Sequence, residues 1–251
     1  MTSKIRKSCW LQDITWHEYM IGITKSTVFF VAVLYLFYES ALPGIVLFPI
    51  WFFYFREWME ECTRKKELEF RSQFRDSIQT LASALKAGYS SENAILETKN
   101  DLMPMYGPDC RISKEFSLMV RQIGLHVPVG QVLSEFAARV RQEDVENFVN
   151  VFISAKKSGG DSIAIIRNAI KIISDKIDTE KEIQTMLAAK KMEFEIMSFI
   201  PFGIILYMKL TFGDFFQVLY GNFAGIAVMT GALILYLTAY MLGKKLTRIE
   251  I

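Results

Sequence analysis

The apolar residues of this chain are concentrated in four stretches, at residues 19–38, 41–55, 196–212 and 223–242. A helix needs ~20 predominantly apolar residues to cross the hydrocarbon core of a bilayer, and the fourth stretch reaches this length. Neither "VFFVAVLYLFY" nor "LILYLTAYML" has a polar face for water, which argues against a helical hairpin buried in a soluble core. The pattern therefore predicts about four transmembrane helices in two pairs, with a short or re-entrant N-terminal hairpin as an alternative.

Residues 56–195 hold most of the charge, and their apolar positions recur at helical spacing. Phe70, Phe74, Ile78, Leu81 and Leu85 follow at steps of four, four, three and four, which places them on one face of a helix. Strict alternation, the mark of a strand, is absent. The sequence predicts an all-α chain in which a helical bundle lies between the two membrane pairs.

Capping and turn residues divide this block into six predicted helices. Gly88 ends the first, Ser90 or Ser91 caps the second, and Gly124 stops the third. A loop is expected at Pro104, Gly107 and Pro108, and "HVPVG" is expected to turn the chain before the fourth helix. The buried faces are predicted to carry Phe116, Met119 and Ile123 on the third helix, Val132, Leu133, Phe136 and Val140 on the fourth, and Val145, Phe148, Val149, Phe152 and Ala155 on the fifth.

The sixth helix is predicted to begin near Ser162 and to continue past Leu187, without a break, into the third apolar stretch. Before it stands "AKKSGGDSIAIIRNAI". A phosphate-binding P-loop needs GxxxxGK[ST] after a strand, whereas this Gly-Gly-Asp follows a helix and has no Lys-Ser or Lys-Thr. A corner between antiparallel helices is the better interpretation, with Gly159 and Gly160 ending one helix and Asp161 capping the next.

Lysine and arginine residues flank the apolar pairs on one side. They are Lys4, Arg6 and Lys7, then Arg56, Arg64, Lys65 and Lys66, and finally Lys244, Lys245 and Arg248. By the positive-inside rule, both termini and the central block are cytoplasmic, and the net charge of +2 adds little to this assignment. The expected division is a cytoplasmic segment at 1–18, a transmembrane hairpin at 19–58, a cytoplasmic bundle at 59–194, a transmembrane pair at 195–243 and a cytoplasmic tail at 244–251. The N-terminus does not resemble a cleavable signal peptide.

Candidate chemistry is sparse. Cys9, Cys62 and Cys110 form no CxxC pair, and neither His17 nor His126 has a second ligand at metal spacing. The carboxylates Glu67 with Glu69, Glu92, Glu143 with Asp144, and Glu180 with Glu182 could be acid/base or metal pairs, but a solvated helix face suits them better, because charges of both signs alternate there. We therefore predict no catalytic, cofactor-binding or metal-binding residue, and no cofactor. Small residues at Ala227 and Gly231, and at Gly221 and Gly225, give weak support for helix packing in the membrane.

Three passages together resemble the F-domain family of type II secretion and type IV pilus systems. They are "LASALKAGYSSENAILE", the region from "EFSLMVRQIG" to "SAKKSGGDSIAIIRNA", and "DTEKEIQTMLAAKKMEFEIMSFIPFGIILYMKL". The most specific features are the Leu-Ala-x-Ala-Leu-x-Ala-Gly run at 81–88, the Gly-Gly-Asp corner at 159–161 and Pro201 inside the third apolar stretch. The resemblance covers residues 70–210.

The resemblance implies a non-catalytic inner-membrane platform protein of the single-domain tight-adherence type, in a bacterial or archaeal cytoplasmic membrane. Its implied partners are a secretion ATPase, a pilin or pseudopilin, and a paralogous F-domain subunit or a second copy of the chain. Membrane lipids are also expected partners, and nucleic acid is not. A helical membrane adaptor or receptor without an export role is the alternative.

Overall fold

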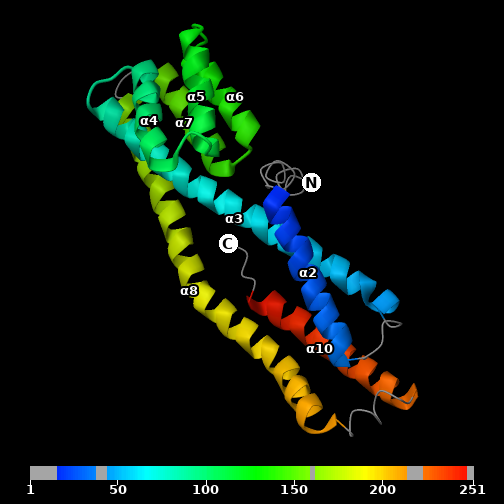
Figure 1. Cartoon of the computed structure of the whole chain (residues 1–251). Coiled ribbons are helices and arrows are strands. Elements are labelled where there is room, and N and C mark those ends of the chain that lie inside the picture. Colours follow the sequence, from blue (N-terminus) through cyan, green and yellow to red (C-terminus); the bar gives the residue numbers. More distant parts are fainter. Residues whose placement is uncertain (1–15, 38–43, 159–161, 214–222, 248–251) are drawn as a thin grey trace. The chain divides into compact units, whose positions relative to one another are not determined.

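The computed structural model describes residues 16–37, 44–158, 162–213 and 223–247, and within these ranges the chain is helical and contains no strand (Figure 1). The helices are α2 (Trp16–Phe37), α3 (Gly44–Lys86), α4 (Ser91–Tyr106), α5 (Arg111–Gly124), α6 (Val129–Val140), α7 (Glu143–Ser158), α8 (Ser162–Thr211) and α10 (Phe223–Thr247). The all-α prediction is confirmed for the described part of the chain.

The chain divides into two compact units. The described residues of the first are 62–158 and 162–179, and those of the second are 16–37, 44–61, 180–213 and 223–247. Helices α3 and α8 each contribute to both units without interruption. The continuity predicted for the helix beginning near Ser162 is confirmed, because α8 runs for 50 residues and includes Pro201.

The first unit is a helical bundle around one hydrophobic core. The predicted α3 face of Phe70, Phe74, Ile78, Leu81 and Leu85 is buried, with each residue at most 4% exposed. Helix α4 packs on α5, α5 on α6 and α6 on α7. Phe rings meet at the centre of this core, where the Phe74 ring lies edge-on to that of Phe148 and its centroid is 6.3 Å from that of Phe136. The buried positions predicted on α7 all lie in the same core.

The predicted ends of α3 and α4 are mostly confirmed. Gly88 follows α3 with a φ of +92°, a value that L side chains rarely adopt, and the Ser90 hydroxyl accepts the Asn93 N–H at the start of α4. The prediction that Pro104 lies in a loop is wrong, because α4 continues to Tyr106 and the turn begins at Gly107. Pro104 stands so near the end of α4 that its missing N–H affects only the closing turn.

Helices α7 and α8 run antiparallel within the first unit. Lys176 of α8 pairs with Glu143 and Asp144 at the start of α7, whereas Ile165, near the start of α8, lies by Ser154 and Ala155 near the end of α7. This arrangement agrees with the predicted corner between antiparallel helices. The corner residues themselves, Gly159, Gly160 and Asp161, lie outside the described residues.

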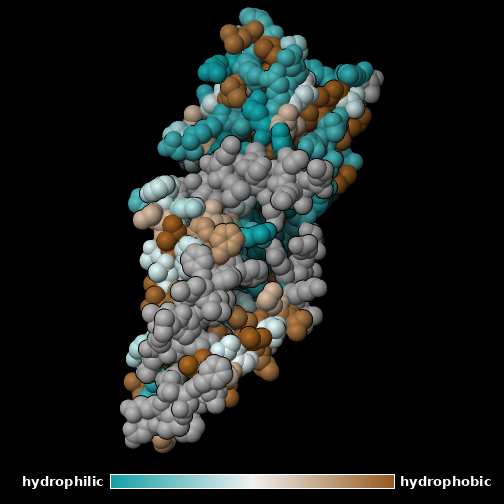
Figure 2. Space-filling model, turned by 90° about the vertical axis from the view of Figure 1, so that its right-hand side faces the viewer, coloured by the Kyte–Doolittle hydropathy of each residue, from teal (hydrophilic) through white to brown (hydrophobic). Residues whose placement is uncertain are grey.

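The second unit contains the apolar stretches. Among the described residues, three helical segments are long and apolar enough to cross a bilayer, namely Trp16–Phe37, Ile163–Thr211 and Gly225–Lys244. The second of these segments begins in the first unit and continues through the second. Val33, Leu36 and Phe37 of α2 pack with Met229 and Leu233 of α10 in a small core of this unit. Exposed hydrophobic side chains gather over the second unit, whereas hydrophilic side chains cover much of the bundle (Figure 2).

The turn at Gly88 gives a test of the bundle. Replacing Gly88 with Val should lower the free energy of unfolding by about 1 kcal/mol or more, because a β-branched residue is strained at positive φ. No described atom outside its chain neighbours lies within 4 Å of the added Cβ, so the effect would come from the backbone and not from a clash. Chemical denaturation of the full chain in detergent, followed by circular dichroism, measures it.

Gly124→Val is the matched control, since that site is equally open and its φ is not positive. Its effect should stay within about 0.5 kcal/mol. Equal losses in the two variants would contradict the assigned role of Gly88.

Candidate functional site

A buried carboxylate joins three helices of the first unit. Asp144 of α7 is 2% exposed. One of its oxygens accepts hydrogen bonds from the Arg71 guanidinium of α3, at 2.9 Å from Nε and 2.7 Å from Nη2. The other accepts from Lys176 Nζ of α8 at 2.9 Å. Both carboxylate oxygens are therefore satisfied by cations, which is the condition under which a buried charge is tolerated.

The prediction that Asp144 lies on a solvated helix face is wrong. The side chain of the adjacent Glu143 is 67% exposed, whereas that of Asp144 is 3% exposed. Successive residues of a helix point in different directions, so one carboxylate of the pair reaches water and the other enters the bundle. Arg71 and Lys176 stand 73 and 32 residues away in sequence, so the local alternation of charges could not reveal them.

Three further polar side chains of α3 make contacts near Arg71. Glu67 accepts a hydrogen bond of 3.0 Å from the buried Gln142, directly before α7. Arg75 pairs with Asp178 of α8 and with Asp76 at 2.9 Å. We call Glu67, Arg71, Arg75 and Asp76 the α3 polar cluster. It connects α3 to the start of α7 and to the part of α8 that pairs with it.

The α3 polar cluster also holds α4. The Tyr106 hydroxyl donates to the Asp76 carboxylate. Burial raises the pKa of Tyr106 to about 12, and the hydrogen bond to Asp76 adds to this shift. Tyr106 therefore stays protonated as a donor at physiological pH, and α3 contacts α4, α7 and α8 through one row of polar side chains.

The other carboxylates weighed from the sequence do not converge on a site. Glu92 pairs with Lys156 at 3.4 Å, and its own backbone N–H, followed by the Lys156 charge, lowers its pKa. Glu69 accepts from Gln73, and Glu182 is exposed. Within the described ranges, no group of three His, Cys, Asp or Glu side chains is placed to hold a metal ion.

The histidines and cysteines are likewise scattered. His17 is exposed on α2, and His126 is exposed in the turn between α5 and α6 with a φ of 63°. Cys62 and Cys110 are free thiols, and the Cys110 thiol donates to the Gln73 side-chain oxygen at 3.0 Å. Cys9 lies outside the described residues.

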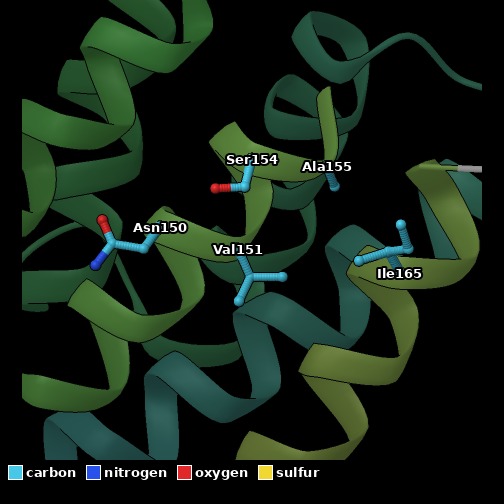
Figure 3. Close-up of a pocket in the computed structure, with 5 residues that line it drawn as sticks. All are labelled: Asn150, Val151, Ser154, Ala155 and Ile165. Carbon is cyan, nitrogen blue, oxygen red and sulfur yellow. The ribbon is translucent and has the colours of Figure 1, made fainter. Parts of the chain in front are cut away.

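A shallow groove of about 300 Å³ lies between α7 and α8 (Figure 3). Its lining consists of Asn150, Val151, Ser154, Ala155 and Ile165, none of which is charged. These side chains offer no acid, base or metal ligand, so the groove is suited to packing contacts and not to chemistry.

The small-residue pair of Ala227 and Gly231 on α10 does not pack against the described part of the chain. Ala227 and Gly231 are both exposed, and in the described part of the chain no atom beyond the local helix lies within 4 Å of a Cβ added at Gly231. Gly221, the partner of Gly225 in the other small-residue pair, lies outside the described residues.

Asp144 provides a quantitative test of the buried network. Asp144→Ala should lower the free energy of unfolding by about 3 kcal/mol, because Arg71 and Lys176 would lose their shared anion in a desolvated place. Denaturant unfolding of the purified full chain gives the value.

Glu143→Ala is the matched control. It removes the neighbouring carboxylate, which also faces Lys176 but lies 3.6 Å from it and is exposed to solvent. Its effect should stay below about 1 kcal/mol, and equal losses in the two variants would contradict the special role of Asp144.

Comparison with known proteins gives a match at the family level. The family model described as "Type II secretion system (T2SS), protein F" matches residues 77–209, which is more than half of the 251 residues. The search of curated proteins and that of solved structures each gave no significant match.

The region that the family model matches begins on α3, contains α4 to α7 and extends along α8 to Lys209. Members of this family are generally non-catalytic, membrane-associated platform proteins of secretion machinery. With most of the bundle and most of α8 inside the match, the chain belongs to the type II secretion system protein F family.

Proposed function

We propose that this chain is the platform protein of a tight-adherence or related type IV pilus, or of a type II secretion machine, and that it couples a cytoplasmic ATPase to pilin assembly. The observation that carries the proposal is the extent of the family match, which covers most of the bundle and continues into the third apolar stretch. This family works in secretion machinery alongside ATPases and pilins. The chain would act by positioning and movement, without catalysis of its own.

The proposed coupling element is α8. Its first turns pack in the bundle core through Ile166, Ile170, Ile173 and Ile177, and its last turns belong to an apolar segment long enough to span a bilayer. A continuous helix transmits displacement or rotation along its axis, whereas a flexible linker absorbs it. Lys176 and Asp178 attach the same helix to α7 and α3 by ion pairs, so a movement of the bundle would carry α8 with it.

The proposed membrane arrangement places the bundle and both termini in the cytoplasm. It rests on the lysine and arginine residues that flank the apolar pairs. The proposal keeps four crossings, of which three correspond to the candidate spans and the fourth to the N-terminal part of α3.

A single F domain offers limited surface to a ring-shaped ATPase. We therefore propose that the chain works as a homodimer or beside a paralogous F-domain subunit. The exposed Ala227 and Gly231 are suited to close helix packing in such a pair. Copurification should recover the second F-domain chain or a self-dimer, together with the ATPase.

Complementation of a deletion strain tests the coupling role. Deletion should abolish surface fibres while prepilin processing continues, and the wild-type gene should restore the fibres. A Gly-Gly-Ser-Gly insertion between Thr179 and Glu180 should fail to restore them, because it interrupts α8 where the two units meet in the sequence. Electron microscopy of fibres and immunoblots of prepilin are the measurements.

The control is the same insertion between Gly107 and Pro108, in the turn between α4 and α5, which should restore fibres. Normal fibres from the α8 insertion would contradict coupling through that helix. Normal fibres in the deletion strain would contradict the platform role altogether and favour an adaptor.

Cysteine labelling tests the topology. In a background without the three native cysteines, a Ser90→Cys variant should react with a membrane-impermeant maleimide only after the cytoplasmic side is opened. Asn222→Cys, between the last two apolar stretches, should react from outside. External labelling of residue 90 in intact cells is the result that reverses the orientation.

A further inference from the structure

Pro201 is a weak point in the backbone of α8. A proline has no backbone N–H, so Pro201 cannot donate to the Met197 carbonyl one turn earlier, and its ring crowds that carbonyl. On the same turn, the Ser198 hydroxyl donates to the Phe194 carbonyl at 2.8 Å, a contact that competes with the backbone hydrogen bonds of a helix. The turn that ends at Pro201 therefore has reduced backbone support.

The inner face of the apolar part of α8 is narrow. Between residues 191 and 211 no residue is fully buried, and the partly buried ones recur at helical steps. They are Lys191, Phe194, Ser198, Pro201, Phe202, Ile205, Met208 and Lys209. Pro201 and the residues beside it thus lie on the face that meets the other helices of the second unit.

One side chain of α10 contacts α8 on both sides of this proline. The Tyr236 hydroxyl donates a hydrogen bond of 2.9 Å to the carbonyl of Ser198, which precedes Pro201 on the same turn. The Tyr236 ring lies edge-on to the ring of Phe202, the residue directly after Pro201, with 5.1 Å between the centroids. Tyr236 therefore makes a polar contact before the proline and an aromatic contact after it.

The Ser198 carbonyl is a suitable place for such a contact. In a regular α-helix this carbonyl accepts the N–H of Phe202, which is the first backbone donor after Pro201. Prolines are tolerated in membrane helices because groups on neighbouring helices satisfy the backbone atoms that a proline frees. The Tyr236 hydroxyl is a group of this kind, since it reaches the weakened turn from a different helix.

Tyr236 is itself held in place by other rings. Tyr240, one turn further along α10, stacks on Tyr236 with 6.3 Å between the centroids. The Tyr240 ring also stacks on Phe194 of α8 at 5.6 Å. Helix α10 contains no proline, so it can support α8 from outside along the turn where α8 is weakest.

We propose that Tyr236 of α10 braces α8 across Pro201, so that the turns before and after the proline move together. Without this contact, a displacement passing along α8 would be absorbed by bending at Pro201. Because the brace comes from α10, this helix would move with α8. The inference rests on the membrane placement and the coupling role of α8 within the proposed function, and it adds Tyr236 as a positioning residue.

A distance measurement along α8 tests the brace. In the full chain without native cysteines, spin labels are attached at the exposed positions Met192 and Leu210, which lie about five helical turns apart and so on the same side of α8. Pulsed electron paramagnetic resonance in lipid nanodiscs gives the distribution of distances. Tyr236→Phe removes only the hydroxyl and should raise the population with an altered distance about threefold or more, the factor expected for one side-chain hydrogen bond between membrane helices. Tyr240→Phe is the matched control and should leave the distribution unchanged.

A background without the proline separates bracing from ordinary packing. Pro201→Ala restores the backbone N–H, so α8 would no longer depend on Tyr236, and adding Tyr236→Phe should then leave the distance distribution unchanged. Equal widening by Tyr236→Phe with and without Pro201→Ala would mean that Tyr236 only packs. No widening by Tyr236→Phe in the presence of Pro201 would mean that the proline needs no brace. Either result overturns the proposal. The nanodiscs contain neither ATPase nor pilin, so failure here leaves the complementation result to decide the platform role.

Discussion

The bundle depends on one buried carboxylate. Asp144 accepts hydrogen bonds from Arg71 and from Lys176, so a single side chain of α7 fixes the positions of α3 and α8. The apolar faces of the three helices would tolerate small changes of register, because hydrophobic contact is not directional. The two charge-assisted hydrogen bonds to the buried carboxylate tolerate such changes of register far less, since each bond has a defined direction and distance. The contacts of Glu67 and Arg75 extend this constraint along α3. The hydrogen bond from Tyr106 to Asp76 applies it to α4 as well.

Much of the helical architecture could be predicted from the sequence, because it depends on local periodicity. The steps between Phe70 and Leu85 are set by the pitch of a helix, and the residues at these steps are buried as expected. Gly88 and Ser90 act within one or two turns of their own positions, so their effects were also predictable. The prediction that Pro104 lies in a loop is wrong because a proline is tolerated close to the end of a helix, and periodicity does not define where α4 ends.

The polar contacts could not be predicted, because their partners are distant in the chain. Glu143 and Asp144 are neighbours with the same chemistry, and only the three-dimensional arrangement decides which one is buried.

The unbroken course of α8 has a consequence for how its last turns are positioned. A helix that advances by one residue moves about 1.5 Å along its axis and turns by about 100°. Such a step would take Lys176 away from Asp144 and rotate Ile173 and Ile177 out of the bundle core. Helix α8 continues from these residues without a break, past Pro201 and Lys209, to Thr211. In the proposed coupling role, the register set by this ion pair in the first unit is the one that α8 would pass to the apolar stretch beginning twenty residues later.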